Sequence, residues 1–332
     1  MWPFGAPPVP PPPPPPMLSS EHALVLIKLF LSVGTPCLFL ASQGIPYNDT
    51  AKAPLKSTVM RKMQWYLAVG FAARRARTIF ALNIVFTFSL GVLLRLTVFG
   101  DAQTSKQIHG GADEVASKSS MADLVAYNTT SILFAIYSSY VGLKAWFDGT
   151  AAKIGATAMD RMYAHSSAIE ELCAVITGYE SFNLLAVIVL PEYRSAAFIG
   201  HHAVTLALGV MSLHPWCHYY GIFFFGVAST SSIPLCLGEM LNAIDLPGAA
   251  DLAKPAFVLL FFTIRTAYWP YVSLGFWRDS LWALASPMKR VHSYAAYVLL
   301  LLANIFLTGL QVMWTIQICD AAADILRGDA SH

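Results

Sequence analysis

A pair of adjacent histidines inside an apolar stretch is the feature of this 332-residue chain best suited to acid–base chemistry. His201 and His202 stand in the segment Ile199-Gly-His-His-Ala-Val-Thr205. Histidine titrates near neutral pH and therefore serves as a general acid or base. Neighbours on a helix point about 100° apart, so the two rings should meet different partners, whereas His201 and Thr205 share a face. Catalysis by one ring and simple interhelical hydrogen bonding both remain open.

Two charged residues stand in the middle of other apolar stretches. Glu180 follows Tyr179 and precedes Asn183 by three residues, and Arg265 lies in Phe-Phe-Thr-Ile-Arg. A carboxylate inside a bilayer must be protonated or paired, and arginine keeps its proton and needs a partner. Their signs are opposite and their depths similar. We therefore hypothesise that Glu180 and Arg265 pair across the bundle.

A third polar feature is the run Ser229-Thr-Ser231-Ser232-Ile-Pro234. Small hydroxylated residues allow helices to approach closely, and a proline removes a backbone hydrogen bond. The run predicts a tightly packed, kinked helix. His214 and His218 have the four-residue spacing of two zinc ligands, with Cys217 between them, but the intervening proline disrupts a helical register. We predict no metal site.

The composition excludes a soluble enzyme. Hydrophobic residues make up 56% of the chain and charged residues only 12%, against roughly 25% charged residues in soluble domains. A net charge of +2 excludes the strongly basic surface of a nucleic-acid-binding protein. The five cysteines contain no Cys-x-x-Cys pair and do not indicate a redox compartment.

The elements that must position these residues are membrane-spanning helices of about 20 apolar residues each. The sequence predicts an all-α, polytopic membrane bundle of about eight such helices. Their expected ranges are 23–40, 79–99, 130–147, 172–190, 196–213, 219–241, 256–276 and 295–318.

Basic residues predict the orientation. Seven lysines and arginines lie between the first and second spans, and such loops face the cytosol. The N-terminus is then lumenal, and eight spans return the C-terminus to the lumen. Residues 1–20 are proline-rich and are expected to be a disordered tail, in which residues 7–16 form a candidate ligand for a proline-binding domain.

From about residue 121 to 318, these features resemble the TLC domain of the TRAM/Lag1/CLN8 superfamily. The resemblance rests on five segments in the same order as in the family. They are Asn128 to Ala135, Gly178 to Asn183, His201-His202 with Thr205, Ser229 to Pro234, and Phe261 to Arg265. The resemblance implies a six-helix bundle with a lipid-accessible cavity, preceded here by two further spans.

The chain departs from the family pattern at several polar positions. Phe134 replaces a histidine and Asn183 replaces an aspartate. The serine-rich run lacks a preceding glutamate, the nearest acid being Glu239 after it, and the His-Asp-x-x-Asp stretch of the ceramide synthases is absent. An amide cannot act as a general base. Glu180, one turn before Asn183, is a substitute that competes with its pairing to Arg265.

These observations lead to one expected function and one alternative. The resemblance implies a multi-pass protein of the endoplasmic reticulum that binds, senses or maintains membrane lipids. The alternative is an N-acyltransferase of the ceramide-synthase type, with acyl-CoA as co-substrate and no other cofactor. His201 and His202 are the catalytic candidates. Cavity or structural polar roles are expected for Tyr179, Glu180, Asn183, Thr205, Ser231, Ser232 and Arg265.

Domain boundaries follow from the same interpretation. The partners expected are membrane lipids and a second copy of the chain, not nucleic acid. The predicted segments are a tail at 1–20, two spans with a basic cytosolic loop at 21–120, the TLC domain at 121–318 and a C-terminal tail at 319–332.

Overall fold

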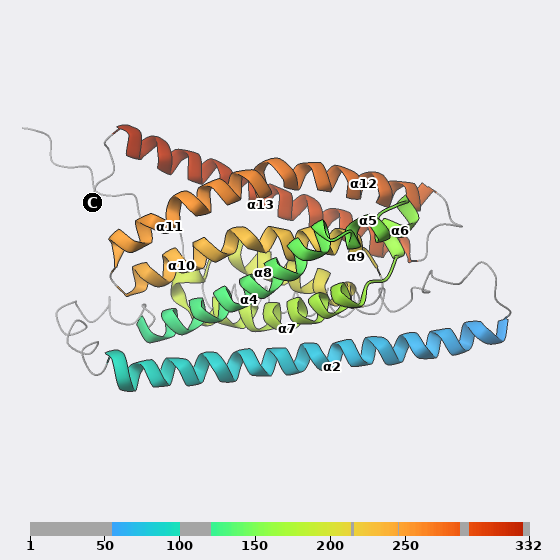
Figure 1. Ribbon diagram of the computed structural model, residues 1–332, viewed down its shortest axis with the longest axis horizontal. Coiled ribbons are helices and arrows are strands. Elements are labelled where there is room, and N and C mark those ends of the chain that lie inside the picture. The colour runs from blue at the N-terminus through green and yellow to red at the C-terminus, as the bar shows by residue number, and fades with distance from the viewer. Residues whose placement is uncertain (1–54, 100–120, 214–215, 245, 286–291, 328–332) are drawn as a thin grey trace, which may run out of the picture.

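The computed structural model describes residues 55–99, 121–213, 216–244, 246–285 and 292–327. Every regular element in these ranges is a helix, as the sequence predicts. The predicted first span and the proline-rich tail lie outside the described residues. Figure 1 shows the long helices running side by side along one axis.

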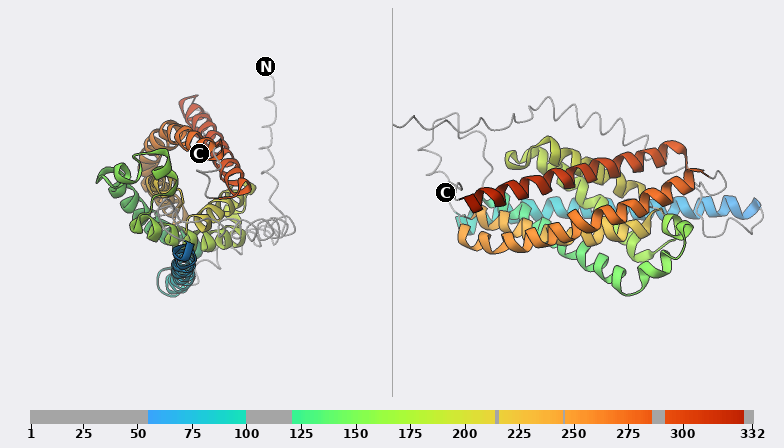
Figure 2. Two further views of the ribbon diagram at one scale, coloured as in Figure 1. Left: turned by 90° about the vertical axis from the view of Figure 1, so that its right-hand side faces the viewer. Right: turned by 90° about the horizontal axis from the view of Figure 1, so that it is seen from above.

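Six helical segments of the described chain form a closed ring. In chain order, the first segment contacts the second, the second the third, the fourth the fifth and the fifth the sixth. The ring closes because the third segment contacts the sixth and the first contacts the fourth (Figure 2, left). Two of the segments are composite, because short π- and 3₁₀-helical stretches interrupt them. The segments are α4 (Met121–Phe147), α7 (Ser167–Val189), α8 (Ala196–Met211), α9–η5–η6–α10 (His218–Gly221, Ile222–Gly226, Val227–Ser231, Ser232–Ala243), α11–η7–α12 (Pro247–Leu260, Phe261–Tyr268, Trp269–Ala285) and α13 (Tyr294–Arg327).

Short helices connect the long ones. Near one end of the ring lie α5 (Thr150–Ile154) and α6 (Ala158–Tyr163), and η4 (Pro191–Tyr193) joins α7 to α8. A capping box begins α6: the Thr157 hydroxyl accepts from the Asp160 backbone N–H, and the Asp160 carboxylate accepts from the Thr157 backbone N–H. This local start signal fixes where the chain re-enters a helix between α4 and α7.

Helix α2 (Leu55–Leu94) lies outside the ring, against α7 and α4, and continues into η2 (Arg95–Phe99). A side chain at Gly178 of α7 would come within 2.5 Å of the Ala76 carbonyl oxygen, so glycine permits this close approach. The sequence predicts a span only from residue 79, with a basic loop before it. The helix instead begins at residue 55, because lysine and arginine are good helix formers and do not end a helix.

Five helical segments of the described residues are long and apolar enough to cross a membrane. Helix α8 is apolar but shorter, and α4 is 27 residues long but is not among the five. The ranges of the five are Ala72–Val98, Ser167–Val189, His218–Ala243, Pro247–Ala285 and Tyr294–Ala323. The expected total of eight spans therefore stays a prediction.

The interrupted helix predicted at the serine run is present. Pro234 has no N–H for the carbonyl of Thr230, and the chain before it is 3₁₀-helical in η6 and π-helical in η5. At the junction of η5 and η6, Gly226 meets Gly142 of α4, where an added Cβ would lie 2.4 Å from the opposite Cα. Two glycines thus let the backbones touch where the interruption begins.

An ion pair joins the short helix α6 to α12, far from the serine run. Arg161 of α6 donates two hydrogen bonds to Asp279 of α12, at 2.5 and 2.9 Å, and the Tyr220 hydroxyl donates a third at 2.5 Å. Asp279 is only 1% exposed. A forked arginine–carboxylate contact of this kind fixes orientation as well as distance. It ties the short connecting helices to the wall of the ring.

Candidate functional site

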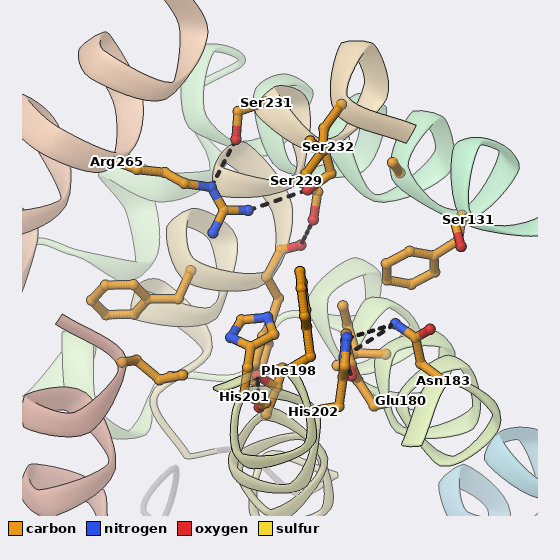
Figure 3. Close-up of a pocket in the computed structure, with 18 of the residues that line it drawn as sticks. Ser131, Glu180, Asn183, Phe198, His201, His202, Ser229, Ser231, Ser232 and Arg265 are labelled. Atoms are coloured by element: carbon orange, nitrogen blue, oxygen red, sulfur yellow. Dashed lines mark hydrogen bonds and ion pairs between the residues drawn. The ribbon is translucent and has the colours of Figure 1, made fainter. Parts of the chain in front are cut away.

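The ring encloses a partly open cavity of about 560 Å³ with a mainly apolar surface. All nine candidate residues from the sequence border it, although they come from four of the six segments. They are Tyr179, Glu180, Asn183, His201, His202, Thr205, Ser231, Ser232 and Arg265. Polar groups that lie far apart in the chain therefore converge on one space (Figure 3).

His202 forms a pair with Glu180 on one side of the cavity. A carboxylate oxygen of Glu180 lies 2.7 Å from Nδ1 of His202, and both residues are buried. The Asn183 amide nitrogen lies 3.1 Å from the same Nδ1, and the Tyr127 hydroxyl donates to the Asn183 oxygen at 2.6 Å. When Nδ1–H donates to Glu180, Nε2 carries the lone pair. The Asn183 amide nitrogen, itself a donor, then has Nε2 at 3.4 Å as its acceptor, and the arrangement is a histidine–carboxylate dyad with an amide beside it.

The hypothesis that Glu180 pairs with Arg265 is wrong. Glu180 lies on α7 and faces His202 on the neighbouring helix α8. Arg265 lies across the cavity in η7 and bonds to the serine run instead. Similar depth in two spans does not put two residues on adjoining faces, and a nearer partner was available to each. Of the two roles that the sequence left open for Glu180, the structure selects the contact with His202.

Arg265 is the centre of the second polar group. Its Nε donates to the Ser231 hydroxyl at 2.7 Å, and Nη2 donates to the Ser232 hydroxyl at 3.2 Å and to the Ala228 carbonyl at 3.0 Å. The 3₁₀ geometry of η6 brings the Ala228 carbonyl and the Ser231 hydroxyl onto the same face. We call Arg265, Ser231 and Ser232 the arginine–serine group.

His201 has different neighbours from His202, as the helical geometry predicts. Its ring contacts Trp314 of α13 at 5.5 Å between centroids, and the ring of His202 at 4.9 Å. The Thr205 hydroxyl donates to the His201 backbone carbonyl at 2.9 Å and not to the ring. Nδ1 of His201 is enclosed, and no described residue forms a hydrogen bond with it. Both histidines border the cavity, and only His202 has a side-chain partner.

The replacement of a family histidine by Phe134 has a structural counterpart. The Phe134 ring stacks on the Tyr179 ring, with centroids 3.5 Å apart and planes within 7°. Both rings border the cavity. An aromatic stack therefore occupies the place where the family pattern has an imidazole, and this part of the wall is apolar.

Several cavity residues were missed by the sequence analysis. Phe198 stacks near His202, Tyr193 receives a hydrogen bond from Asn128 at 2.9 Å, and Asn304 accepts from Trp277 at 2.9 Å. Burial raises the pKa of the Tyr193 phenol and keeps it protonated. Asn304 is a polar residue inside an apolar helix, so the same signal that found Glu180 could have found it. The aromatic residues carried no such signal.

The described residues contain no group of three or more histidine, cysteine, aspartate or glutamate side chains that could hold a metal ion. Both ring nitrogens of His218 face backbone groups: Nδ1 lies 3.3 Å from the Ser166 N–H nitrogen, and Nε2 lies 3.3 Å from the Ser212 oxygen. His214 lies outside the described residues.

Comparison with known families agrees with this architecture. The family model of the TLC domain, from the TRAM/LAG1/CLN8 superfamily, matches residues 125–320. No curated protein and no solved structure matches the chain. The matched range begins within α4 and ends within α13, so it covers most of the ring and contains all nine candidate residues. The chain therefore belongs to the TLC domain family of membrane proteins.

Proposed function

We propose that this protein binds a membrane lipid in the central cavity and acts in lipid homeostasis or sensing. The observation that carries the proposal is the cavity itself: about 560 Å³, mainly apolar, with a small number of converging polar groups. Ligand sites in proteins have volumes of roughly 300–1,000 Å³ and the same mixture of apolar wall and few polar contacts. The apolar wall includes Phe224, Phe257, Leu300 and Leu307.

The family supports a place in a membrane and is compatible with the endoplasmic reticulum. A cavity inside a ring of apolar helices can take up an acyl chain directly from the bilayer, since both are apolar. The proline-rich segment at residues 7–16 and assembly with a second copy remain proposals for partners.

Lipid extraction tests this function. The protein is purified in detergent, and bound lipids are identified by mass spectrometry in wild type and in Thr205→Trp, which fills the cavity. The matched control is Leu302→Trp on α13, where the leucine is 57% exposed and does not border the cavity. We expect one lipid class to co-purify with wild type and Leu302→Trp and to be lost from Thr205→Trp. Equal lipid in all three would contradict the proposal.

The His202–Glu180 contact favours a second candidate function, N-acyl transfer from acyl-CoA to a sphingoid base. Nε2 of His202 would take a proton from the attacking amine while Glu180 stabilises the imidazolium that forms. The amine nitrogen forms the C–N bond to the thioester carbonyl carbon, the C–S bond breaks, and the proton passes to the departing thiolate. Asn183 is then no obstacle, because the carboxylate comes from Glu180.

A direct assay separates the two candidates. Acyl-CoA and sphinganine are added to the purified protein, and ceramide is measured by mass spectrometry. An acyltransferase would lose about 100-fold or more of its activity in His202→Ala and Glu180→Gln, the usual contribution of a general base. Absence of ceramide from the wild-type protein, with a bound lipid still present, would leave the binding function alone.

A further inference from the structure

The arginine–serine group carries a positive charge that no acidic side chain of the described residues balances. Among the described residues, the ion pairs of the chain's interior join Arg161 to Asp279 and His202 to Glu180, and none includes Arg265. The partners of Arg265 are hydroxyls, a backbone carbonyl and, at 3.5 Å, the Gln311 side-chain oxygen. These neutral groups orient the guanidinium without neutralising it. A lone charge in an apolar span is costly and marks a binding site by default.

The acids bordering the cavity do not supply the missing charge. Glu180 is held by His202 at 2.7 Å. Glu239 is on α10, seven residues after Ser232, which is about 10 Å along a helix. Glu192, the third acid at the cavity, is on η4 between α7 and α8, and no ion pair of the described residues joins it to the arginine. The counter-ion must therefore come from outside the described part of the chain.

Three hydrogen-bond donors face the cavity at this point. Ser232 accepts from Arg265, and its own O–H is not donated to any described residue. The His201 ring borders the cavity, its Nδ1 has no partner among the described residues, and a neutral imidazole carries one N–H that can donate. Nη1 of Arg265 makes only the long contact to Gln311. Figure 3 shows His201 and Arg265 on either side of the same space.

From this geometry we infer that Arg265, Ser232 and His201 bind the oxyanion headgroup of a single-chain lipid, a carboxylate or a phosphate. The inference rests on the proposed lipid-binding function and specifies its ligand class. Guanidinium and hydroxyl donors form charge-assisted hydrogen bonds with oxyanions, and such bonds are about twice as strong as neutral ones. The acyl chain of this lipid extends along the apolar wall of the cavity.

Ligands that share one chain but differ in headgroup test the inference. Binding of radiolabelled hexadecanoate, hexadecanol and hexadecyl phosphate is measured on the full-length purified protein. We expect wild type to bind the acid or the phosphate about tenfold more tightly than the alcohol. The preferred anion distinguishes a fatty carboxylate from a phosphate headgroup.

Two arginine substitutions locate the charge. Arg265→Gln should abolish the preference for the acid or the phosphate over the alcohol, while its affinity for hexadecanol stays unchanged. Arg265→Lys should retain part of the preference for the anion. The control Arg77→Gln removes an exposed arginine of α2, outside the ring, and should leave all three affinities unchanged. A preference that survives in Arg265→Gln overturns the inference.

The remaining outcomes are also decisive. If Arg265→Gln binds none of the three ligands, Ser232→Ala is tested in its place. We expect this variant to reduce the ratio of anion affinity to hexadecanol affinity while its affinity for hexadecanol stays unchanged. Any other result for Ser232→Ala overturns the inference. Equal wild-type affinity for all three, with loss of all three in Thr205→Trp, retains the lipid-binding function and overturns the anion site. No binding of any ligand to the wild-type protein contradicts both.

Discussion

The two polar groups that border the cavity differ in how their charges are balanced. On the α7–α8 side, Glu180 and His202 lie 2.7 Å apart, and Asn183 and Tyr127 extend the network. On the opposite side, the hydrogen-bond partners of Arg265 among the described residues are all neutral oxygens, from Ser231, Ser232, Ala228 and Gln311. In the first group an acid and a histidine are paired with each other, whereas the second group has hydrogen-bond donors without an acceptor among the described residues. Residues alike in polarity and depth therefore have different surroundings, and our proposals assign proton transfer or stability to the first group and an external anion to the second.

Breaking the wall beneath the arginine–serine group should have the largest effect. In Gly142→Leu the new side chain collides with the backbone of Gly226, which directly precedes η6, and neither backbone can move away. We expect loss of folded protein, measured as a shift from the monodisperse to the void peak in detergent size-exclusion chromatography. The matched control is Gly309→Leu on α13, where no atom lies within 4 Å of the added Cβ. A monodisperse Gly142→Leu protein would refute the close contact.

Removing the acid of the complete group should be the next largest change. Glu180→Ala leaves His202 buried without its carboxylate partner. We expect a loss of about 3 kcal/mol in the free energy of unfolding, the usual cost of breaking a buried pair. Thermal unfolding followed by tryptophan fluorescence measures it. His202→Ala, Glu180→Ala and the double variant form a cycle, and purely additive losses would argue against a direct contact.

Within the arginine–serine group, Ser231→Ala should lower the free energy of unfolding by less than Glu180→Ala does. It removes one hydroxyl that accepts from Arg265 at 2.7 Å and itself donates to the Ala228 carbonyl at 3.1 Å. The expected loss is about 1 kcal/mol, because Arg265 keeps its bonds to Ser232 and to Ala228. Ser229→Ala on the same short helix is the control, since the Ser229 hydroxyl donates to the Phe225 carbonyl one turn earlier and forms no hydrogen bond with Arg265. The same unfolding assay should show a smaller change for Ser229→Ala than for Ser231→Ala.

An exposed ion pair provides the smallest expected effect and a reference for the interior. Arg75 of α2 contacts Glu171 of α7, and their side chains are 56% and 40% exposed. Glu171→Gln should change the free energy of unfolding by less than about 1 kcal/mol, because water screens the pair. The effect should also shrink as the salt concentration rises. If Glu171→Gln lowered the free energy of unfolding as much as Glu180→Ala does, solvent exposure would not explain the difference between the surface pair and the buried pair.

Much of the fold could be predicted from the sequence. Seven of the eight predicted spans fall in the described residues, and each coincides with a helix. The main error was the start of α2, where basic residues indicated a loop and the helix runs on from residue 55. Hydropathy reports which helical residues are apolar, not where a helix begins, since charged residues favour helices as well.

The candidate site was predicted as a set of residues but not as a set of contacts. A charged or polar side chain in an apolar span is visible in the sequence, and all nine such candidates border the cavity. The pairing of Glu180 with Arg265 was wrong, because it requires knowledge of which helices adjoin. Phe198 and Trp314, which flank the histidines, were not found, since aromatic residues are common in membrane helices.

The sequence by itself determined the membrane class, the helical spans, the family and the residues that are too polar for their surroundings. These properties depend on local composition and on order along the chain. Only the tertiary structure decided that Glu180 meets His202, that Arg265 is left with neutral partners, and that α2 lies outside the ring. The physical reason is that a helix specifies its polar residues locally, while the partner of each depends on helix order, rotation and close glycine contacts, which arise only when the whole bundle packs.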